Sequence, residues 1–314
     1  MNKPATMRAW RIHDYGGAER LTLETVPVPA THEGELLVKV AVASVNPIDW
    51  KTREGHLRKV MPVPLPRILG RDCAGTVVES GSSAFEPGER VLAVGDPGRD
   101  GCQAEYALVP AGASAQIPAS VPFEESIAFA ISGTSAWMPL AEIANLRRGV
   151  RVLVHAGAGG VGSVGVQLAR HFGAEVFATC SSKNLEFVRS LGATPIDYTC
   201  EDFVAAAGPC DVVFDTVGGE VHRRSFAALK PGGLLVYINA APIDPNPLRQ
   251  DVRVVAAQIR TTTERLEAQL ELAARGVIKG QVGRVFPFEQ ARAAYDLVQT
   301  GHGRGKVMIT TRPE

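Results

Sequence analysis

The chain has 314 residues, which is enough for about two domains of ordinary size. Apolar residues make up 45% of the chain and charged residues 21%, a balance that argues against intrinsic disorder. The 33 basic and 33 acidic side chains cancel, which argues against a nucleic-acid or anionic-membrane partner, because such partners select positively charged surfaces.

The first 120 or so residues are predicted to be rich in β-structure. Short apolar runs, rich in valine, predict strands at residues 36–43, 74–79 and 90–94. Residues 61–66 (MPVPLP) hold three prolines, which exclude a regular helix or a central strand. This segment is therefore predicted to be irregular.

From about residue 125 the sequence predicts strands that alternate with helices. The strands are expected at residues 151–155, 175–179, 196–198, 211–215 and 234–238. The helices are expected at residues 161–172, 184–191, from about 202, and at 221–229. This alternation predicts βαβ units and a parallel sheet.

The tail of the chain does not continue the alternation. Helices are predicted at about residues 262–275 and 288–299, followed by a strand at 306–310. We interpret the α/β segment as an insertion into a first domain, which the tail returns to complete.

A glycine-rich segment at residues 157–162 matches the dinucleotide-binding pattern GxGxxG, between a predicted strand and a predicted helix. Gly157 permits a tight turn, Gly159 lets the backbone approach a pyrophosphate, and Gly162 allows close contact between helix and strand. The N–H groups of the first helical turn then face the phosphates. The predicted binding segment comprises Gly157, Ala158, Gly159, Gly160, Val161 and Gly162. The alternative is a glycine turn packed for structural reasons alone.

The residues that follow the second strand of this α/β segment favour NADPH over NADH. An NAD site usually places Asp or Glu about 20 residues past the glycines, but residues 176–185 contain no acid. Ser181, Ser182 and Lys183 stand there instead, and hydroxyls and an ammonium suit a 2′-phosphate. The alternatives are a solvated Lys183 and, for Tyr198 after the third strand, a half-buried aromatic side chain.

Five sequence blocks, spread over nearly the whole chain, resemble one known family. They are residues 46–55 (NPIDWKTREG), 69–75 (LGRDCAG), 132–137 (SGTSAW), 155–162 (HAGAGGVG) and 303–307 (GRGKV). In these blocks the chain resembles the zinc-independent quinone oxidoreductases of the medium-chain dehydrogenase/reductase superfamily, which include the zeta-crystallin-like enzymes.

This resemblance implies an α/β protein of two domains with NADPH in the cleft between them. A GroES-like, β-rich catalytic domain (residues 1–124 and 263–314) would be joined to a Rossmann domain with a doubly wound parallel sheet (residues 125–262). The resemblance also implies a homodimer. Besides the glycine segment, it assigns cofactor contacts to Thr134, Ser181, Ser182, Lys183, Tyr198, Thr216, Val217, Asn239, Ala240 and Lys306.

The metal ligands of the zinc-dependent relatives are replaced in this sequence. Asn46 stands where those relatives place a cysteine, and Arg71 where they place a histidine. Residues 95–103, which correspond to their four-cysteine lobe, hold only Cys102. The seven histidines show neither HxxH nor HExxH spacing, so no metal site is predicted.

The five cysteines and the N-terminal residues predict a cytoplasmic protein. An odd number of cysteines without CxxC spacing argues against a disulfide framework and fits a reducing compartment. The first ten residues lack the apolar segment of a signal peptide, and no apolar run approaches the roughly 20 residues of a membrane span. No membrane partner is therefore expected.

Without a metal, the expected reaction is hydride transfer to a quinone or an α,β-unsaturated carbonyl, which needs no Lewis acid. Asn46, Lys51 and Tyr106 are the candidate catalytic residues, as donors to the acceptor or the cofactor. The alternatives are a turn residue for Asn46, a solvated lysine for Lys51 and a cleft wall for Tyr106. Asp72 either braces this site or forms an ion pair between loops.

Two other classes of function stay open at this point. The first is an NADPH-binding protein of the same fold with a structural or regulatory role and little turnover. The second is RNA binding, against which the zero net charge argues.

Overall fold

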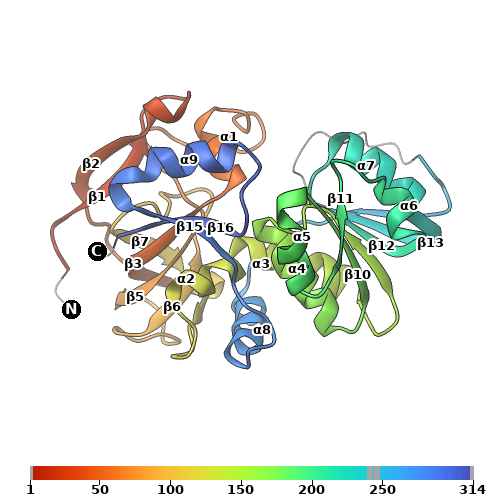
Figure 1. Cartoon of the computed structure of the whole chain (residues 1–314). Helices are drawn as coiled ribbons and strands as arrows, with labels where there is room; N and C mark the ends of the chain where they lie inside the picture. Colours follow the sequence, from red (N-terminus) through yellow and green to blue (C-terminus); the bar gives the residue numbers. More distant parts are fainter. Residues whose placement is uncertain (1–2, 239–242, 244–247, 312–314) are drawn as a thin grey trace. The chain divides into compact units, whose positions relative to one another are not determined.

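The computed structural model describes residues 3–238, 243 and 248–311, and the chain divides into two compact units. The first unit contains Met1–Ile131, Thr261–Arg275 and Val282–Glu314, and the second contains Ser132–Arg260 and Gly276–Gln281. Figure 1 shows that the blue C-terminal segments lie among the red and orange N-terminal ones in the first unit.

The short segment Gly276–Gln281 belongs to the second unit, whereas the sequence analysis assigns all of residues 263–314 to the first domain. The side chain of Gln167 explains this placement. Its Nε2 donates to the carbonyl of Lys279 at 3.0 Å, and its Oε1 accepts from the backbone N–H of Lys279 at 2.8 Å.

A seven-stranded sheet forms the centre of the first unit, in the order β15-β16-β3-β5-β6-β8, with β7 also paired to β3. Its strands are β3 (Glu35–Val45), β5 (Asp72–Ser80), β6 (Arg90–Val94), β7 (Tyr106–Pro110), β8 (Ser114–Gln116), β15 (Val282–Pro287) and β16 (Lys306–Thr310). The last strand, β16, runs antiparallel to β3, so the tail completes the sheet that the first half begins.

In the described residues, a smaller antiparallel sheet and four α-helices complete this unit. The sheet has the order β2-β1-β4, with β1 (Thr6–Ile12), β2 (Thr22–Pro27) and β4 (Arg67–Ile68). The helices are α1 (Pro47–Arg53), α2 (Phe123–Ser126), α8 (Thr263–Ala274) and α9 (Ala291–Gln299). The buried Trp10 of β1 donates from its indole N–H to the carbonyl of Phe288 at 2.8 Å, which ties the N-terminal sheet to the tail.

The second unit is built on a parallel sheet in the order β11-β10-β9-β12-β13-β14. Its strands are β9 (Arg151–Val154), β10 (Glu175–Cys180), β11 (Thr194–Asp197), β12 (Cys210–Asp215), β13 (Leu229–Tyr237) and β14 (Arg253–Ala256). The strand order reverses between β9 and β12, and in open α/β sheets ligands bind at such a switch point, beyond the carboxyl ends of the strands.

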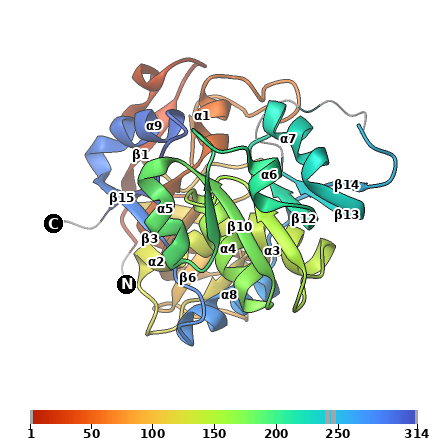
Figure 2. The same cartoon turned by 45° about the vertical axis from the view of Figure 1, so that its right-hand side comes forward.

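Five helices belong to the α/β segment. They are α3 (Ile131–Trp137), α4 (Gly160–His171), α5 (Leu185–Ser190), α6 (Phe203–Ala207) and α7 (Gly219–Ser225). Figure 2 shows α4 and α5 beside β10. Val164 and Leu168 of α4 are fully buried, as the spacing of apolar residues in this helix predicts.

The α/β fold class with a β-rich first domain and a Rossmann-like parallel sheet is confirmed. One boundary is wrong: the helix predicted at residues 221–229 ends earlier, because α7 stops at Ser225 and β13 already begins at Leu229. Strand β13 also begins five residues before the strand predicted at residues 234–238 and includes a Pro-Gly-Gly sequence, opposite which the pairing with β12 shifts in register. No helix in the described residues is long and apolar enough to cross a membrane.

Candidate functional site

The glycine turn at residues 157–162 connects β9 to α4 at the carboxyl end of the parallel sheet. Gly157 donates its N–H to the carbonyl of Thr179 at 2.8 Å, which ties the turn to β10. The residue with a left-handed backbone is Ala156 (φ 52°) rather than Gly157. Gly157 is needed for another reason, because a Cβ there would lie 2.7 Å from the Cβ of Ala178.

The other two glycines of the pattern differ in what surrounds them. A Cβ on Gly162 would lie 2.1 Å from the carbonyl oxygen of Ala156, so this position excludes any side chain. A Cβ on Gly159 would meet only that same oxygen, at 3.3 Å. No other atom of the described residues beyond its chain neighbours lies within 4 Å of that position, and the N–H groups at the start of α4 suit a phosphate there.

The remaining residues of the segment are consistent with this role. Ala158 is buried, whereas Gly160 and Val161 are half-buried in the first turn of α4. This turn therefore fits a dinucleotide in shape and in donors.

A buried polar chain holds the strand before the glycine turn. His155 Nε2 lies 2.9 Å from the hydroxyl of Ser225, which itself donates to the carbonyl of Val221 at 2.7 Å. The imidazole therefore donates from Nε2 and accepts, at Nδ1, from the hydroxyl of Thr179 at 3.1 Å. Burial lowers the pKa of His155 to about 4, so the ring is neutral at pH 7.

The residues predicted to bind the 2′-phosphate lie on two neighbouring strand ends. Ser181, Ser182 and Lys183 follow β10, and Tyr198 follows β11. The backbone N–H of Tyr198 donates to the carbonyl of Cys180 at 3.1 Å, which joins the two segments. Lys183 and Tyr198 are exposed, and in the described part of the chain the ammonium of Lys183 has no hydrogen-bond partner.

Asp215 organises the turn after β12, where Thr216 and Val217 lie. Its carboxylate accepts from the N–H groups of Val217 (2.8 Å) and Gly218 (3.0 Å) and from Nδ1 of His222 (2.9 Å). Burial opposes the charged form, but the bonds from His222 and these N–H groups outweigh it and lower the pKa of Asp215. The hydroxyl of Thr216 donates to the carbonyl of His155 at 2.8 Å, next to the glycine turn.

The structure thus gathers the predicted cofactor residues of the second unit at the carboxyl ends of β9 to β12. Thr134 lies on α3 and is fully buried. Asn239 and Ala240, expected near the nicotinamide, lie outside the described residues.

In the first unit, Asn46 lies at the centre of a buried network at the end of β3. Its Nδ2 donates to Ser44 Oγ and to Asp72 Oδ1, both at 2.8 Å. Its Oδ1 accepts from the ammonium of Lys306 at 2.5 Å. Both N–H groups of the amide are therefore engaged, and Asn46 keeps only a lone pair on Oδ1 for a ligand. It can accept from a ribose hydroxyl but not donate to a carbonyl.

Lys306 therefore binds the side-chain oxygen of Asn46 within the first unit, and it is almost fully buried (3% exposed). From the sequence, Lys306 is expected among the cofactor contacts, with no connection to Asn46. The two residues are 260 positions apart, and the pairing of β16 with β3 brings them together.

Asp49, in the first turn of α1, adds a second buried carboxyl group to this network. Its Oδ2 accepts from the backbone N–H of Asn46 at 2.8 Å. Burial raises the pKa of Asp49 to about 7, and the charge of Asp72 adds to the increase. The bond from Asn46 and the positive charges of Arg71 and Lys306 act in the opposite direction.

We expect Asp49→Asn to flatten the dependence of stability on pH. The unfolded carboxyl titrates near 4 and the folded one near 7, so the folded state binds more protons between these values. Stability is therefore highest below pH 4 and falls as the pH rises through about 7, by at most about 1.4 kcal/mol per pH unit. The amide can still accept from Asn46. Urea unfolding of both proteins from pH 4 to 8 measures the two slopes, and equal slopes contradict the assignment.

Lys51 and Tyr106, the other catalytic candidates, lie in different places. Lys51 is on α1 and half-buried, and burial lowers the pKa of its ammonium. Tyr106 pairs with Lys39 on β3, seven residues before Asn46, which puts the two roughly 20 Å apart along the strand. Tyr106 lines a separate pocket of about 390 Å³, together with Pro64 and other side chains. The structure does not bring it to Asn46.

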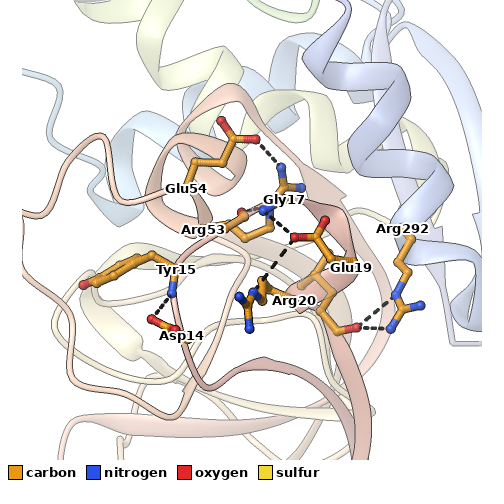
Figure 3. A network of polar contacts seen from close by, with 10 residues as sticks. Asp14, Tyr15, Gly17, Glu19, Arg20, Arg53, Glu54 and Arg292 are labelled. Carbon is orange, nitrogen blue, oxygen red and sulfur yellow. Dashed lines mark hydrogen bonds and ion pairs between the residues drawn. The ribbon is translucent and has the colours of Figure 1, made fainter.

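Arg53, which belongs to the same sequence block as Asn46, has a structural role. It is fully buried, and its Nε donates to the carbonyl of Gly16 at 3.0 Å. Its Nη2 donates to Glu54 (2.6 Å) and Gln299 (3.0 Å), and the guanidinium lies 5.2 Å from the ring centre of Tyr295. Figure 3 shows Arg53 and Glu54 beside the loop that carries Tyr15 and Gly17. Arg53 therefore joins this loop to α1 and α9.

The described residues contain no group of three or more His, Cys, Asp or Glu side chains that could hold a metal ion. At the two positions named in the sequence analysis, Asn46 is engaged with Asp72 and Lys306, and Arg71 carries a guanidinium. Zinc needs three or four N, S or O ligands at close range. The residues present do not fit such a site.

Two family models match the chain. The model of the alcohol dehydrogenase GroES-like domain matches residues 32–119, and that of the zinc-binding dehydrogenases matches residues 191–309.

Two similar proteins of known activity come from plants. The chain is 36% identical to a 2-methylene-furan-3-one reductase of Solanum lycopersicum, over 99% of the chain and 80% of that protein. It is 35% identical to a chloroplastic NADPH-dependent alkenal/one oxidoreductase of Arabidopsis thaliana, over 99% of the chain and 81% of that protein. Among solved structures, the quinone oxidoreductase of Coxiella burnetii is 31% identical with a TM-score of 0.88, covering 98% of this chain and all of its own.

Proposed function

Because the chain belongs to the quinone and enone oxidoreductases of the medium-chain dehydrogenase/reductase superfamily, we propose that it transfers hydride from NADPH to a quinone or an α,β-unsaturated carbonyl. The observation that carries this proposal is the likeness to the alkenal/one oxidoreductase over 99% of the chain. The glycine turn at the switch point of the sheet supports it, because its open face and N–H groups suit a dinucleotide.

NADPH would be held by residues at the carboxyl ends of β9 to β12. The N–H groups of α4 above Gly159 would bind the pyrophosphate, and Ser181, Lys183 and Tyr198 would bind the 2′-phosphate. When bound, the cofactor supplies a hydride from its nicotinamide ring to an electron-poor carbon.

The residues of the first unit are proposed to hold and polarise the acceptor. Hydride addition to the β-carbon of an enone would give an enolate, whose negative charge lies largely on the carbonyl oxygen. A proton on the α-carbon, delivered directly or by tautomerisation of the enol, would then give the saturated carbonyl, whereas a quinone would take protons on its oxygens and give the hydroquinone. Lys51 would donate to this oxygen, and burial lowers the pKa of its ammonium, which favours giving up a proton. Asn46, with one free lone pair, would accept from a cofactor hydroxyl.

A panel of acceptors tests the function directly. We expect NADPH consumption with quinones and with conjugated enals or enones, and no reduction of NADP+ with simple saturated alcohols. Tight NADPH binding without turnover on any acceptor would instead indicate a binding protein, the alternative that the relatives do not favour.

We expect Lys183→Ala to weaken the binding of NADPH about tenfold to a hundredfold and to leave the binding of NADH nearly unchanged. The ammonium of Lys183 is exposed and unpaired in the described residues. A hydrogen bond between this charged group and a phosphate contributes roughly 1.5–3 kcal/mol to binding, and about 1.4 kcal/mol changes a dissociation constant tenfold. Steady-state kinetics with both cofactors measures the ratio. A wild-type preference for NADH contradicts the 2′-phosphate site, and an unchanged ratio in the variant contradicts only the role of Lys183.

We propose that the reaction is independent of zinc, because the side chains of residues 3–238, 243 and 248–311 form no group of three or more metal ligands. Prolonged chelation is expected to leave activity unchanged, and elemental analysis to find zinc below one equivalent per chain. Loss of activity on chelation that added zinc restores would contradict this proposal.

We also propose a cytoplasmic homodimer. The resemblance implies the dimer, and β14 forms an edge of the parallel sheet through which a second copy can add. Light scattering after size-exclusion chromatography tests the dimer, and a fluorescent fusion tests the location.

A further inference from the structure

The two neighbouring serines after β10 differ in the state of their hydroxyl protons. Resting on the NADPH-dependent function proposed above, we infer that Ser181 alone donates to the 2′-phosphate, while the proton of Ser182 is committed to a chain that ends at Asp197. The sequence does not distinguish the two residues, because both are serines that follow the same strand.

The proton chain starts from the buried carboxylate of Asp197, the last residue of β11 (4% exposed). Thr199 donates its hydroxyl proton to Asp197 Oδ1 at 2.7 Å and its backbone N–H to the same oxygen at 3.0 Å. A threonine hydroxyl has one proton, so Oγ1 of Thr199 can only accept in its other contacts.

The oxygen of Ser182 lies 3.2 Å from Oγ1 of Thr199. Because Thr199 has no second proton to give, Ser182 must donate in this contact. The hydroxyl of Ser182 then presents only lone pairs to a ligand. The neighbouring hydroxyl groups of Ser182 and Thr199 lower the pKa of Asp197 to about 2, so the carboxylate stays charged and keeps accepting from Thr199.

Lone pairs and a nearby carboxylate are unfavourable partners for a phosphate, which accepts hydrogen bonds and carries negative charge. A ribose 2′-hydroxyl, by contrast, can donate to the lone pairs of Ser182. The arrangement at Ser182 thus gives no advantage to NADPH over NADH.

The hydroxyl of Ser181, unlike that of Ser182, can donate its proton to a ligand. Its oxygen accepts from Nδ2 of Asn184 at 3.2 Å, and the described residues contain no acceptor for its own proton. Asn184 is largely buried (8% exposed), and its backbone N–H donates to the carbonyl of Ser181 at 2.8 Å. Asn184 is therefore a positioning residue, which leaves the Ser181 proton available to a phosphate oxygen.

Serine-to-alanine variants at the two positions form a matched pair. Dissociation constants for NADPH and for NADH, measured by calorimetry on the full chain, give a preference ratio for each protein. We expect Ser181→Ala to reduce the preference for NADPH about tenfold, by loss of one bond to a charged group. We expect Ser182→Ala to change it by less than about twofold, or to shift it toward NADPH.

A double-mutant cycle tests the positioning by Asn184. We expect Asn184→Ala to weaken the binding of NADPH severalfold in the wild-type background. In the Ser181→Ala background we expect no further effect, because Asn184 acts by orienting the hydroxyl of Ser181. An equal effect in both backgrounds contradicts this role, since a purely structural loss does not depend on Ser181.

The outcomes separate the inference from the function on which it rests. If the wild type does not prefer NADPH, the proposed cofactor is wrong. If the wild type prefers NADPH and Ser182→Ala loses as much of that preference as Ser181→Ala, the assignment of the protons is wrong and the cofactor stands.

Discussion

Gly159→Val is expected to abolish detectable binding of NADPH while the protein keeps its fold. In the structure, a Cβ at this position meets the carbonyl oxygen of Ala156 at 3.3 Å, a tight contact that a shift of a few tenths of an ångström relieves, and we expect the fold to tolerate it. The two methyl groups of valine would occupy the space in which the backbone must approach the pyrophosphate. We expect the dissociation constant for NADPH to rise by more than about a hundredfold, which is about 2.7 kcal/mol or more.

The matched control for this prediction is Gly162→Ala, three residues further along the same turn. Its Cβ would lie 2.1 Å from the carbonyl oxygen of Ala156 and 2.9 Å from the Cα of Gly157, and both are backbone atoms that cannot move aside alone. Calorimetric binding and thermal unfolding together distinguish the two variants. Gly159→Val should keep the melting temperature of the wild type and fail to bind NADPH, whereas Gly162→Ala should melt at a clearly lower temperature. Normal NADPH affinity in Gly159→Val contradicts the proposed site.

Asp72→Ala is expected to lower the free energy of unfolding by about 3–5 kcal/mol, the range found when one member of a buried charged network is removed. Asp72 is fully buried, and its Oδ1 accepts from the hydroxyl of Ser44 and from Nδ2 of Asn46 at 2.8 Å. Its Oδ2 accepts from the N–H of Ile131 at 3.3 Å. The substitution leaves these donors buried without an acceptor, and removes a negative charge from the network that contains Lys306.

Urea unfolding measures this loss of stability. Two further variants show whether it comes from the buried carboxylate. Asp72→Asn keeps one acceptor oxygen but loses the charge, so we expect a smaller loss than for alanine. Glu19→Ala removes a carboxylate of the same unit that is 72% exposed and 3.9 Å from Arg20, and we expect a change within about 0.5 kcal/mol. A loss below about 1 kcal/mol in Asp72→Ala contradicts the role of Asp72 as a support of Asn46.

The local patterns that the sequence contains predict most of the second unit, although not the strand β14 at its edge. Alternation of apolar strands and amphipathic helices predicts the parallel sheet, because each βαβ unit is built from contacts close in sequence. The glycine turn is predicted for the same reason, since strand, turn and helix are consecutive. In a parallel sheet, consecutive strands end at one edge, so the meeting of Lys183 and Tyr198 at neighbouring strand ends also follows from the order of elements.

The first unit is less accessible to sequence analysis. Strand β3 pairs with β5, β7 and β16, which lie far from it in the chain, and none of the strands β1, β2, β7 and β15 is predicted from the sequence. The family resemblance, rather than periodicity, indicates a GroES-like domain here. The sequence block around Asn46 identifies the right region, but it does not separate Arg53, a buried structural cation, from the residues near the site.

The sequence by itself determined the class of the fold, the glycine turn and the absence of an acid after β10, because these are properties of consecutive residues. The tertiary structure decided which side chains share a network and which protons they hold. Lys306 reaches Asn46 only because β16 returns to β3, and Ser182 differs from Ser181 only because β11 places Asp197 and Thr199 beside it. A hydrogen bond depends on the direction and the number of protons at each atom, and neither is a function of residue type and spacing.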